Sequence, residues 1–389
     1  MGSGIVPAGR RHDSPDAGAH QANRRPGRGG VGGGRALPAA STAARIRGSR
    51  RSALAILGRI LRDRGVITDR QLQEAIQHQV LYGGRLGTSL QELGFITEER
   101  LTDALARAKG VPAADLRALQ PEAVALVPKK FAQRFKVFPC RVRGKTLFLG
   151  MVDPGDHAAV AHVGYSLGYI VRPLVVPEFR MVQLLRDHYG IDERWRFTDT
   201  HGNAPAVPEV KDPAAAAERI DAAATRDEVV AAVLALGRCY FRRVVFFIVR
   251  EPWVLGWDGA GESMDRARAA ALRVPLDLPS VFQGVTRNRT MFVGRPGPEE
   301  ANLAFLEAIG KKAGTTAAVF PVAVRGRVVN LMWGDSGSAG AARGDLGQLL
   351  AFMQKIPRAY LRIIRARVAE IRKPTGPEPG ENEKEERNE

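Results

Sequence analysis

The sequence predicts an α+β protein whose folded parts lie between unstructured ends. Three observations support this fold class. Residues 57–79 and 86–108 are near-copies with helical spacing, strand-like and helix-like segments alternate over 111–192, and β-prone runs appear within 242–259 and 317–333. A chain of 389 residues has room for two or three domains. We therefore expect a tandem helical repeat, a small α/β subdomain, and a separate antiparallel sheet flanked by helices.

The two ends of the chain are predicted to be disordered. Residues 1–51 are rich in Arg, Gly and Pro, and their ten arginines and two aspartates contribute +8 of the net charge of +17. Such a segment buries too little apolar surface to offset its ordering entropy. Residues 373–389 form an acidic tail of the same kind. Because so much of the positive charge lies in a solvated tail, nucleic-acid binding is the least favoured of our hypotheses.

The remaining composition indicates a cytoplasmic protein. No apolar run approaches the roughly 18 residues that a membrane-spanning helix needs. The first residues lack the apolar core of a signal peptide. Cys140 and Cys239 are the only cysteines, and we expect both to be reduced thiols. We expect no membrane span and no metal or other cofactor.

The repeat is the most informative feature of the sequence. Matched residues are 29 positions apart, as in Leu57 and Leu86 or Gly58 and Gly87. Self-similarity at a fixed period indicates one supersecondary unit built twice. Each unit, 56–79 and 85–108, is predicted to be a short helix, a stop and a second helix.

Glycine and threonine mark the boundaries within each unit. Gly65 and Gly94 stand where a helix ends, and a positive φ is favourable there for glycine. Thr68 begins a capping box with Gln71, and Thr97 caps the equivalent helix of the second unit.

Two units with the same glycine and leucine suit a two-fold-symmetric ligand. Glycine at a helix start lets a phosphate approach the backbone N–H groups. Arg85, beside the second glycine, has the chemistry to stack on a purine and pair with a phosphate. The sequence thus predicts a notch formed by Gly58 and Gly87. A purely structural helix pair, with glycines for turns and leucines for the core, is the alternative that the residues leave open.

Residues 111–192 are predicted to form the small α/β part, and residues 218–372 are predicted to form a second domain. The linker between them is predicted at 193–217, which holds three prolines and little periodicity. The predicted helices are 121–134, 156–167, 177–188, 227–239 and 346–372. The predicted strands are two within 137–154, around a turn at Arg143-Gly144-Lys145, and then 169–176, 242–251, 254–259, 317–324 and 327–333.

No enzyme motif survives inspection of its context. Gly144-Lys145-Thr146 resembles the end of a phosphate-binding loop, but Pro139 stands where that motif needs glycine, and strands rather than a helix flank it. The Ser336 region resembles a nucleophilic-serine box, but Ser338 stands where the second glycine is required. We predict no catalytic residues and no metal ligands.

Residues 54–192 resemble the N-terminal domain of type II secretion and type IV pilus assembly ATPases, of the MshE N-terminal type. The shared features are the tandem LGxxLxxxGxITxxxLxxAL units, the spacer 80–84, Leu126-Val127-Pro128, Met151-Val152-Asp153-Pro154, and a final Tyr189-Gly190. Some members of this family bind cyclic-di-GMP through both repeats. The resemblance implies that the same ligand binds here, with no other cofactor.

The ligand-contacting positions implied by the resemblance come from both repeats. They are Leu57, Gly58, Leu72, Ile76, Gln79, Arg85, Leu86, Gly87, Leu101 and Leu105. The sequence departs from the family pattern at two places: Ile56 stands where the family has Arg, and Ala108 where it has Gln. A lost charge-assisted hydrogen bond is worth about 1.5–3 kcal/mol, so these departures predict weakened binding.

Residues 218–372 are similar to a GAF domain, an antiparallel sheet flanked by helices. The similar segments are the helix at 227–239, the strands within 243–258, residues 281–294, and the hairpin at 320–335. GAF domains bind small ligands or serve as dimerisation modules, so this resemblance implies either a small-ligand site or a homodimer interface. Trp253, Trp257 and Trp333 are predicted either to line a ligand pocket or to pack in the core.

No Walker A motif occurs in residues 193–389, so the family's ATPase activity is not implied. We therefore expect a non-enzymatic regulatory protein, a cyclic-di-GMP effector or adaptor that signals to type II secretion or type IV pilus assembly proteins. The alternative is a protein-interaction scaffold with no nucleotide ligand.

Overall fold

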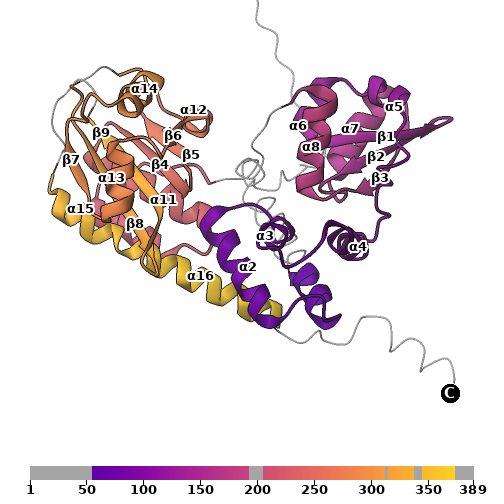
Figure 1. Cartoon of the computed structure of the whole chain (residues 1–389), viewed down its shortest axis with the longest axis horizontal. Helices are drawn as coiled ribbons and strands as arrows, with labels where there is room; N and C mark the ends of the chain where they lie inside the picture. The colour runs from indigo at the N-terminus through magenta and orange to yellow at the C-terminus, as the bar shows by residue number, and fades with distance from the viewer. Residues whose placement is uncertain (1–54, 192–204, 312–313, 337–343, 373–389) are drawn as a thin grey trace, which may run out of the picture. The chain divides into compact units, whose positions relative to one another are not determined.

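The computed structural model describes residues 55–191, 205–311, 314–336 and 344–372 (Figure 1). The predicted tails, 1–51 and 373–389, lie outside the described residues. So do residues 193–204 of the predicted linker, whereas its last five positions belong to helix α10 (Pro213–Ala222). The described residues all belong to one compact unit of the chain.

The tandem repeat is helical, as predicted. A helix at 55–63 begins the first unit. The helices that follow are α2 (Asp69–Tyr82), α3 (Leu86–Glu92) and α4 (Glu98–Lys109). Gly65 and Gly94 have φ of 64° and 69° and end the first helix of each unit.

The two threonine caps are also confirmed, but they differ. Thr68 forms the full capping box with Gln71, in which the hydroxyl accepts from the Gln71 N–H at 3.2 Å and the Gln71 side chain accepts from the Thr68 N–H at 2.9 Å. Thr97 accepts a single, longer bond of 3.4 Å from the Arg100 N–H. The first unit is therefore the better capped of the two.

A three-stranded sheet follows the repeats. Its strands are β1 (Val137–Arg143), β2 (Thr146–Met151) and β3 (Ile170–Val175), in the order β1-β2-β3. The first pair is antiparallel and the second parallel. The helices of this part are α5 (Pro121–Leu126), α6 (Lys129–Phe135), α7 (His157–Leu167) and α8 (Glu178–Tyr189). Separate hydrophobic clusters cover the two sides of this sheet.

Two helices that were predicted as continuous are each broken by proline. The predicted helix 121–134 divides into α5 and α6 because Pro128 holds Val127 in an extended conformation, with φ of −99° and ψ of 110°. The predicted helix 346–372 divides at Gln354 into α15 (Leu346–Met353) and α16 (Lys355–Arg372). Pro357 has no N–H and its ring would collide with the carbonyl four residues earlier, at Met353.

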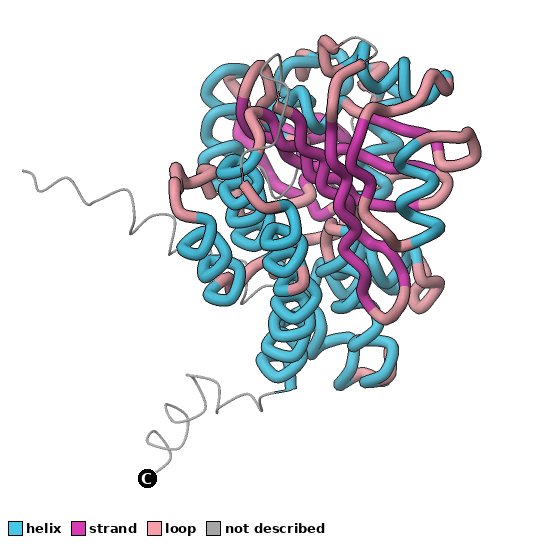
Figure 2. The backbone as a smooth tube through the Cα atoms, turned by 90° about the vertical axis from the view of Figure 1, so that its left-hand side faces the viewer, coloured by secondary structure: helices cyan, strands magenta, loops and turns pink. Residues whose placement is uncertain are grey.

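The C-terminal part is built on a six-stranded antiparallel sheet of order β6-β5-β4-β9-β8-β7. Figure 2 shows the strands in magenta with helices in cyan around them. The strands are β4 (Arg243–Arg250), β5 (Trp253–Gly261), β6 (Arg273–Pro275), β7 (Phe292–Gly294), β8 (Ala317–Val324) and β9 (Arg327–Asp335). Its helices besides α15 and α16 are α10 (Pro213–Ala222), α11 (Arg226–Tyr240), α12 (Arg266–Ala271), α13 (Val281–Asn288) and α14 (Glu300–Ala308).

Strand β4 shows how both faces of this sheet are covered. Val244 and Phe246 belong to the hydrophobic cluster that includes α11 and α16, whereas Val245 and Phe247 pack with α13 and α14. Alternate residues point to opposite faces, so a strand buried on both sides has a continuous apolar sequence. The predicted fold class, with an antiparallel sheet flanked by helices, is confirmed.

The helical repeats share a hydrophobic cluster with the C-terminal helices. Leu61, Leu72 and Ile76 of the first unit belong to the same cluster as Ile363 and Ile371 of α16. Helix α2 packs directly against α16 (Figure 1). This contact places the last helix of the described chain beside the predicted ligand site.

Candidate ligand-binding site

One cavity of about 570 Å³ collects most of the predicted ligand residues. Of the ten, seven line it: Leu57, Gln79, Arg85, Leu86, Gly87, Leu101 and Leu105. Gly58, Leu72 and Ile76 do not. Their role in ligand binding stays a prediction, but the structure brings residues of both repeats to one concave surface.

The second repeat presents its glycine to this cavity. Gly87 lies in the first turn of α3, after Arg85, which has an extended backbone at the N-cap position. A Cβ atom at Gly87 would lie 2.9 Å from the Leu101 Cδ1 atom, so a side chain there requires the leucine to shift. Gly87 and Leu101 thus form a closely packed floor of the cavity, as the repeat predicts.

The first repeat does not. A Cβ atom at Gly58 would lie 3.4 Å from the Leu72 Cδ1 atom, which repeats the glycine–leucine contact of the second unit. It would also lie 3.1 Å from the Cδ1 atom of Ile371, a fully buried residue of α16. The prediction that both glycines face one open notch is therefore wrong for Gly58, because a side chain of the C-terminal helix covers it.

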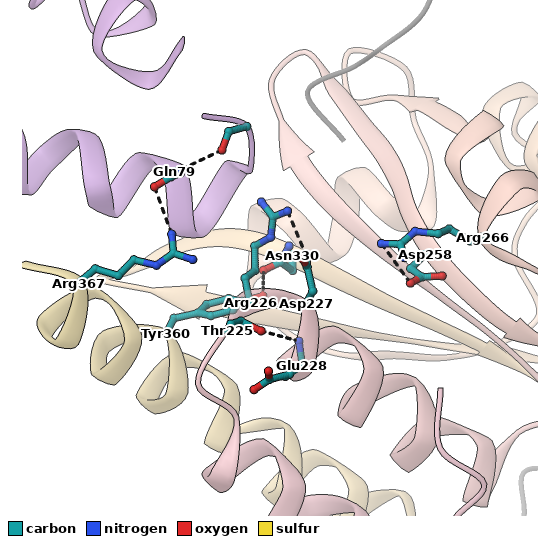
Figure 3. Close-up of polar contacts among 11 residues, drawn as sticks. Gln79, Thr225, Arg226, Asp227, Glu228, Asp258, Arg266, Asn330, Tyr360 and Arg367 are labelled. Atoms are coloured by element: carbon teal, nitrogen blue, oxygen red, sulfur yellow. Dashed lines mark hydrogen bonds and ion pairs between the residues drawn. The ribbon is translucent and has the colours of Figure 1, made fainter. Parts of the chain in front are cut away.

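Gln79, at the end of the first repeat, has both ends of its amide engaged. Its Nε2 donates to the Gly84 carbonyl at 3.0 Å, and its Oε1 accepts from the Arg367 Nη1 at 3.1 Å (Figure 3). Arg367 belongs to α16, as does Ile371. Helix α16 therefore contacts two of the predicted ligand residues of the first repeat, Gly58 and Gln79.

Arg85 is held by a carboxylate that sequence reasoning missed. The Glu178 side chain, only 4% exposed, pairs with the Arg85 Nε at 3.8 Å. Glu178 also accepts a short hydrogen bond from the Thr88 hydroxyl. It begins α8, about 90 residues after Arg85 in the chain, and nothing in the local sequence signals this contact. The carboxylate orients Arg85 and would compete with a phosphate for its guanidinium.

The opposite wall comes from the C-terminal part. Arg226, at the start of α11, is buried and lies over the Trp257 ring, 3.7 Å from its centroid. Burial lowers the pKa of Arg226, and the adjacent Asp227 carboxylate, at 3.3 Å, opposes that effect. Arg362 of α16 donates to the Ile220 and Ala223 carbonyls at 3.2 and 2.7 Å, at the end of α10. These arginines were not predicted as site residues.

The charges around the cavity are balanced. Five basic side chains line it, namely Arg85, Lys109, Arg226, Arg362 and Arg367. Five acidic ones do so as well, namely Asp153, Glu178, Asp227, Glu228 and Glu370. Lys109 already pairs with Asp153 at 2.9 Å. A dianionic ligand would therefore have to draw Arg85 and Lys109 away from carboxylates that they hold here.

Two of the three tryptophans discussed for the C-terminal part, Trp257 and Trp333, belong to its core. Trp257 and Trp333 are fully buried, and Trp333 stacks on Phe282 with ring centroids 5.7 Å apart. Trp253 is 40% exposed. Of the two readings of these residues, core packing is the one that the structure shows for Trp257 and Trp333.

Within the described residues, no three His, Cys, Asp or Glu side chains gather as a metal site would require. Among the helices in the described part of the chain, none is both long and apolar enough to cross a bilayer.

Comparison with known proteins finds a family match in the first half of the chain. Residues 110–195 match the MshEN domain. The resemblance to the N-terminal domains of pilus and secretion ATPases is thereby confirmed for this part of the chain. The matched residues follow the repeats directly and include β1–β3 and α8, which carries Glu178.

Two curated relatives extend the comparison. The type IV pilus assembly ATPase PilB of Myxococcus xanthus is 33% identical over 136 residues, which are 34% of this chain and 24% of PilB. Bacteriophage adsorption protein B of Escherichia coli is 34% identical over 136 residues, which are 34% of this chain and 18% of that protein. The chain spans less than a quarter of either relative. A segment similar to about a third of this chain therefore occurs both in a pilus assembly ATPase and in a bacteriophage adsorption protein.

Solved structures resemble each part of the chain separately. A structure of MshE with cdg is 32% identical, covers 34% of this chain and 98% of that one, and has a TM-score of 0.29. A GAF domain/HD domain protein from Geobacter sulfurreducens is 11% identical, covers 40% of this chain and 97% of that one, and has a TM-score of 0.28.

Proposed function

We propose that this protein is a non-enzymatic regulator that binds cyclic-di-GMP in the cavity between its helical repeats and its C-terminal part. The observation that supports this proposal is the gathering of seven predicted ligand residues, from both repeats, around one cavity of about 570 Å³. Gly87 lines this cavity without a side chain of its own, the Leu101 side chain packs beside it, and Arg85 lines the same cavity. MshE, whose solved structure contains cdg, is the precedent for the ligand.

In its cellular role, the proposed protein is a cytoplasmic effector or adaptor of type II secretion or type IV pilus assembly proteins. The match to the MshEN domain and the relationship to PilB support this setting. Homodimerisation through the C-terminal sheet domain is part of the same proposal. Light scattering of the purified chain with and without ligand measures the oligomeric state directly.

The ligand is tested by calorimetric titration of the full chain with cyclic-di-GMP. We expect saturable binding that the Arg85→Ala variant weakens about ten- to a hundredfold, since a charge-assisted hydrogen bond is worth about 1.5–3 kcal/mol. Arg100→Ala is the matched control, because Arg100 is exposed on the second repeat and does not line the cavity. Equal affinities for the two variants would contradict the assignment of Arg85.

A scaffold without a nucleotide ligand is the second candidate, and one observation favours it. Ile371 already covers Gly58 of the first repeat, and Arg367 already donates a hydrogen bond to its Gln79 side chain. A titration that releases no heat from the wild type and none from variants that loosen these contacts would support the scaffold.

A further inference from the structure

The end of helix α16 lies where the first half of a two-repeat ligand would bind. Ile371 is fully buried against Gly58, and Arg367 holds the Gln79 amide. The Arg62 Nη1, on the first helix of the repeat, donates to the Ile371 carbonyl at 3.4 Å. Three contacts from separate positions of the first repeat thus fix the last two turns of α16.

The second repeat shows what the first would look like without α16. The three atoms nearest to a Cβ atom at Gly87 all belong to Leu101 of its own unit, and Gly87 lines the cavity. Gly58 meets both its own leucine and Ile371. The repeats are alike in sequence and differ here because α16 covers one of them.

The same helix is anchored in the C-terminal part at its other end. Ile356 and Tyr360 are fully buried there. The Tyr360 hydroxyl donates to the Asn330 Oδ1 at 3.1 Å, and the Asn330 Nδ2 donates to the Phe247 carbonyl at 3.0 Å (Figure 3). One continuous helix therefore joins the central strands β4 and β9 to the ligand face of the first repeat.

We propose that the last two turns of α16 are an intramolecular competitor of the ligand: a cyclic dinucleotide spans both repeats only after residues 365–372 leave the first one. This inference rests on the proposed function, since it concerns regulation of the same cavity. A ligand that binds one of two conformations shifts the population toward it, and its apparent affinity falls with the fraction of competent molecules. Ligand binding and release of α16 are thereby coupled.

The coupling gives the C-terminal part a signal to read. Because α16 leaves the sheet core at one end and reaches the repeats at the other, ligand binding changes the surroundings of its last turns while its first turns stay anchored. Ligand binding then exposes the freed end of α16, which carries Arg365, Arg367 and Arg372. The signal does not require any change in the linker.

The test compares cyclic-di-GMP affinities of the full chain and two α16 variants. If α16 is seated in nine of ten molecules, Arg367→Gln and Ile371→Ala should each tighten binding by up to about tenfold. Arg365→Gln is the matched control, because Arg365 is exposed on the same helix and does not line the cavity. Arg367→Gln keeps the test valid if loss of the buried Ile371 side chain unfolds the helix end.

A second readout follows α16 itself. Amide hydrogen exchange at 365–372 should accelerate on saturation with cyclic-di-GMP, whereas 356–364 should stay protected. An Arg85-dependent affinity that Arg367→Gln leaves unchanged or weakens would overturn the competition and leave the proposed function standing. Absence of binding in the wild type and in both α16 variants would overturn both, and binding by the variants alone would support both.

Discussion

The two helical repeats have nearly the same sequence and different surroundings. Gly87 in the second repeat faces a cavity, whereas Gly58 in the first is covered by Ile371. Gln79 ends the first repeat and is bound by Arg367, and Ala108 occupies the equivalent place in the second and lines the cavity. An internal repeat fixes the local structure of both units, but the rest of the chain decides which one stays open to a ligand.

The largest expected effect on stability comes from truncating the matched leucines of the two repeats to alanine. Leu72 contacts Gly58 in the closed unit, and Leu101 contacts Gly87 beside the cavity. Leu72→Ala should lower the free energy of unfolding by about 2–5 kcal/mol, as for other buried leucines. Leu101→Ala should cost less, since one side of Leu101 already borders empty space.

Urea denaturation of both variants measures this comparison, with midpoints compared at equal slopes. Equal losses of unfolding free energy would mean that the cavity beside Leu101 does not reduce the cost of its truncation. The two repeats would then be equivalent in packing, contrary to the structure.

The ion pair between Arg85 of the second repeat and Glu178 offers a test of ligand binding. Glu178→Gln should tighten cyclic-di-GMP binding about tenfold, or about 1.4 kcal/mol, because Arg85 no longer has to leave a carboxylate. The glutamine side-chain oxygen still accepts a bond from Thr88. Calorimetric titration gives the affinity.

The control for this change is Glu122→Gln, on an exposed position at the start of α5. It should leave the affinity unchanged. Weaker binding by Glu178→Gln would show instead that the carboxylate orients Arg85 for the ligand and that this role outweighs its competition.

The smallest expected effect concerns the helix caps. Thr68 makes a reciprocal capping box, whereas Thr97 accepts one bond of 3.4 Å. Thr68→Ala should cost about 1 kcal/mol of stability, within the usual range for threonine caps. Thr97→Ala should cost less, because its bond is longer and has no reciprocal partner.

Thermal unfolding of the two variants, with Thr→Ser at each position as the matched control, checks this order. Serine keeps the hydroxyl and should retain most of the stability. A larger loss at Thr97 would contradict the assignment of the first repeat as the better capped unit.

Much of the local structure was predictable because it depends on short-range signals. Both threonine caps, both helix-ending glycines and the hairpin at Arg325-Gly326 appear as expected, the last with φ of 52° and 79°. The two wrong helices failed for a local reason as well: Pro128 and Pro357 each broke a pattern whose apolar spacing continues on both sides. The short strands β6 and β7 were missed because three residues give too little periodicity.

The candidate site divides in the same way. Gly87 and Leu101 could be found because the repeat marks them in the sequence, and Arg85 because it precedes the second Leu-Gly pair and matches the family pattern. Glu178, Arg367 and Ile371 could not, because each lies far along the chain from its partner and reaches it only through tertiary packing.

By itself, then, the sequence determined two copies of a helical unit, each with a glycine in its first helix, and an antiparallel sheet after them. Only the tertiary structure decided that the copies are unequal. The physical reason is that α16 has an apolar face long enough to continue past the sheet domain, and the uncovered leucines of the first repeat were the surface on which it could bury Ile371.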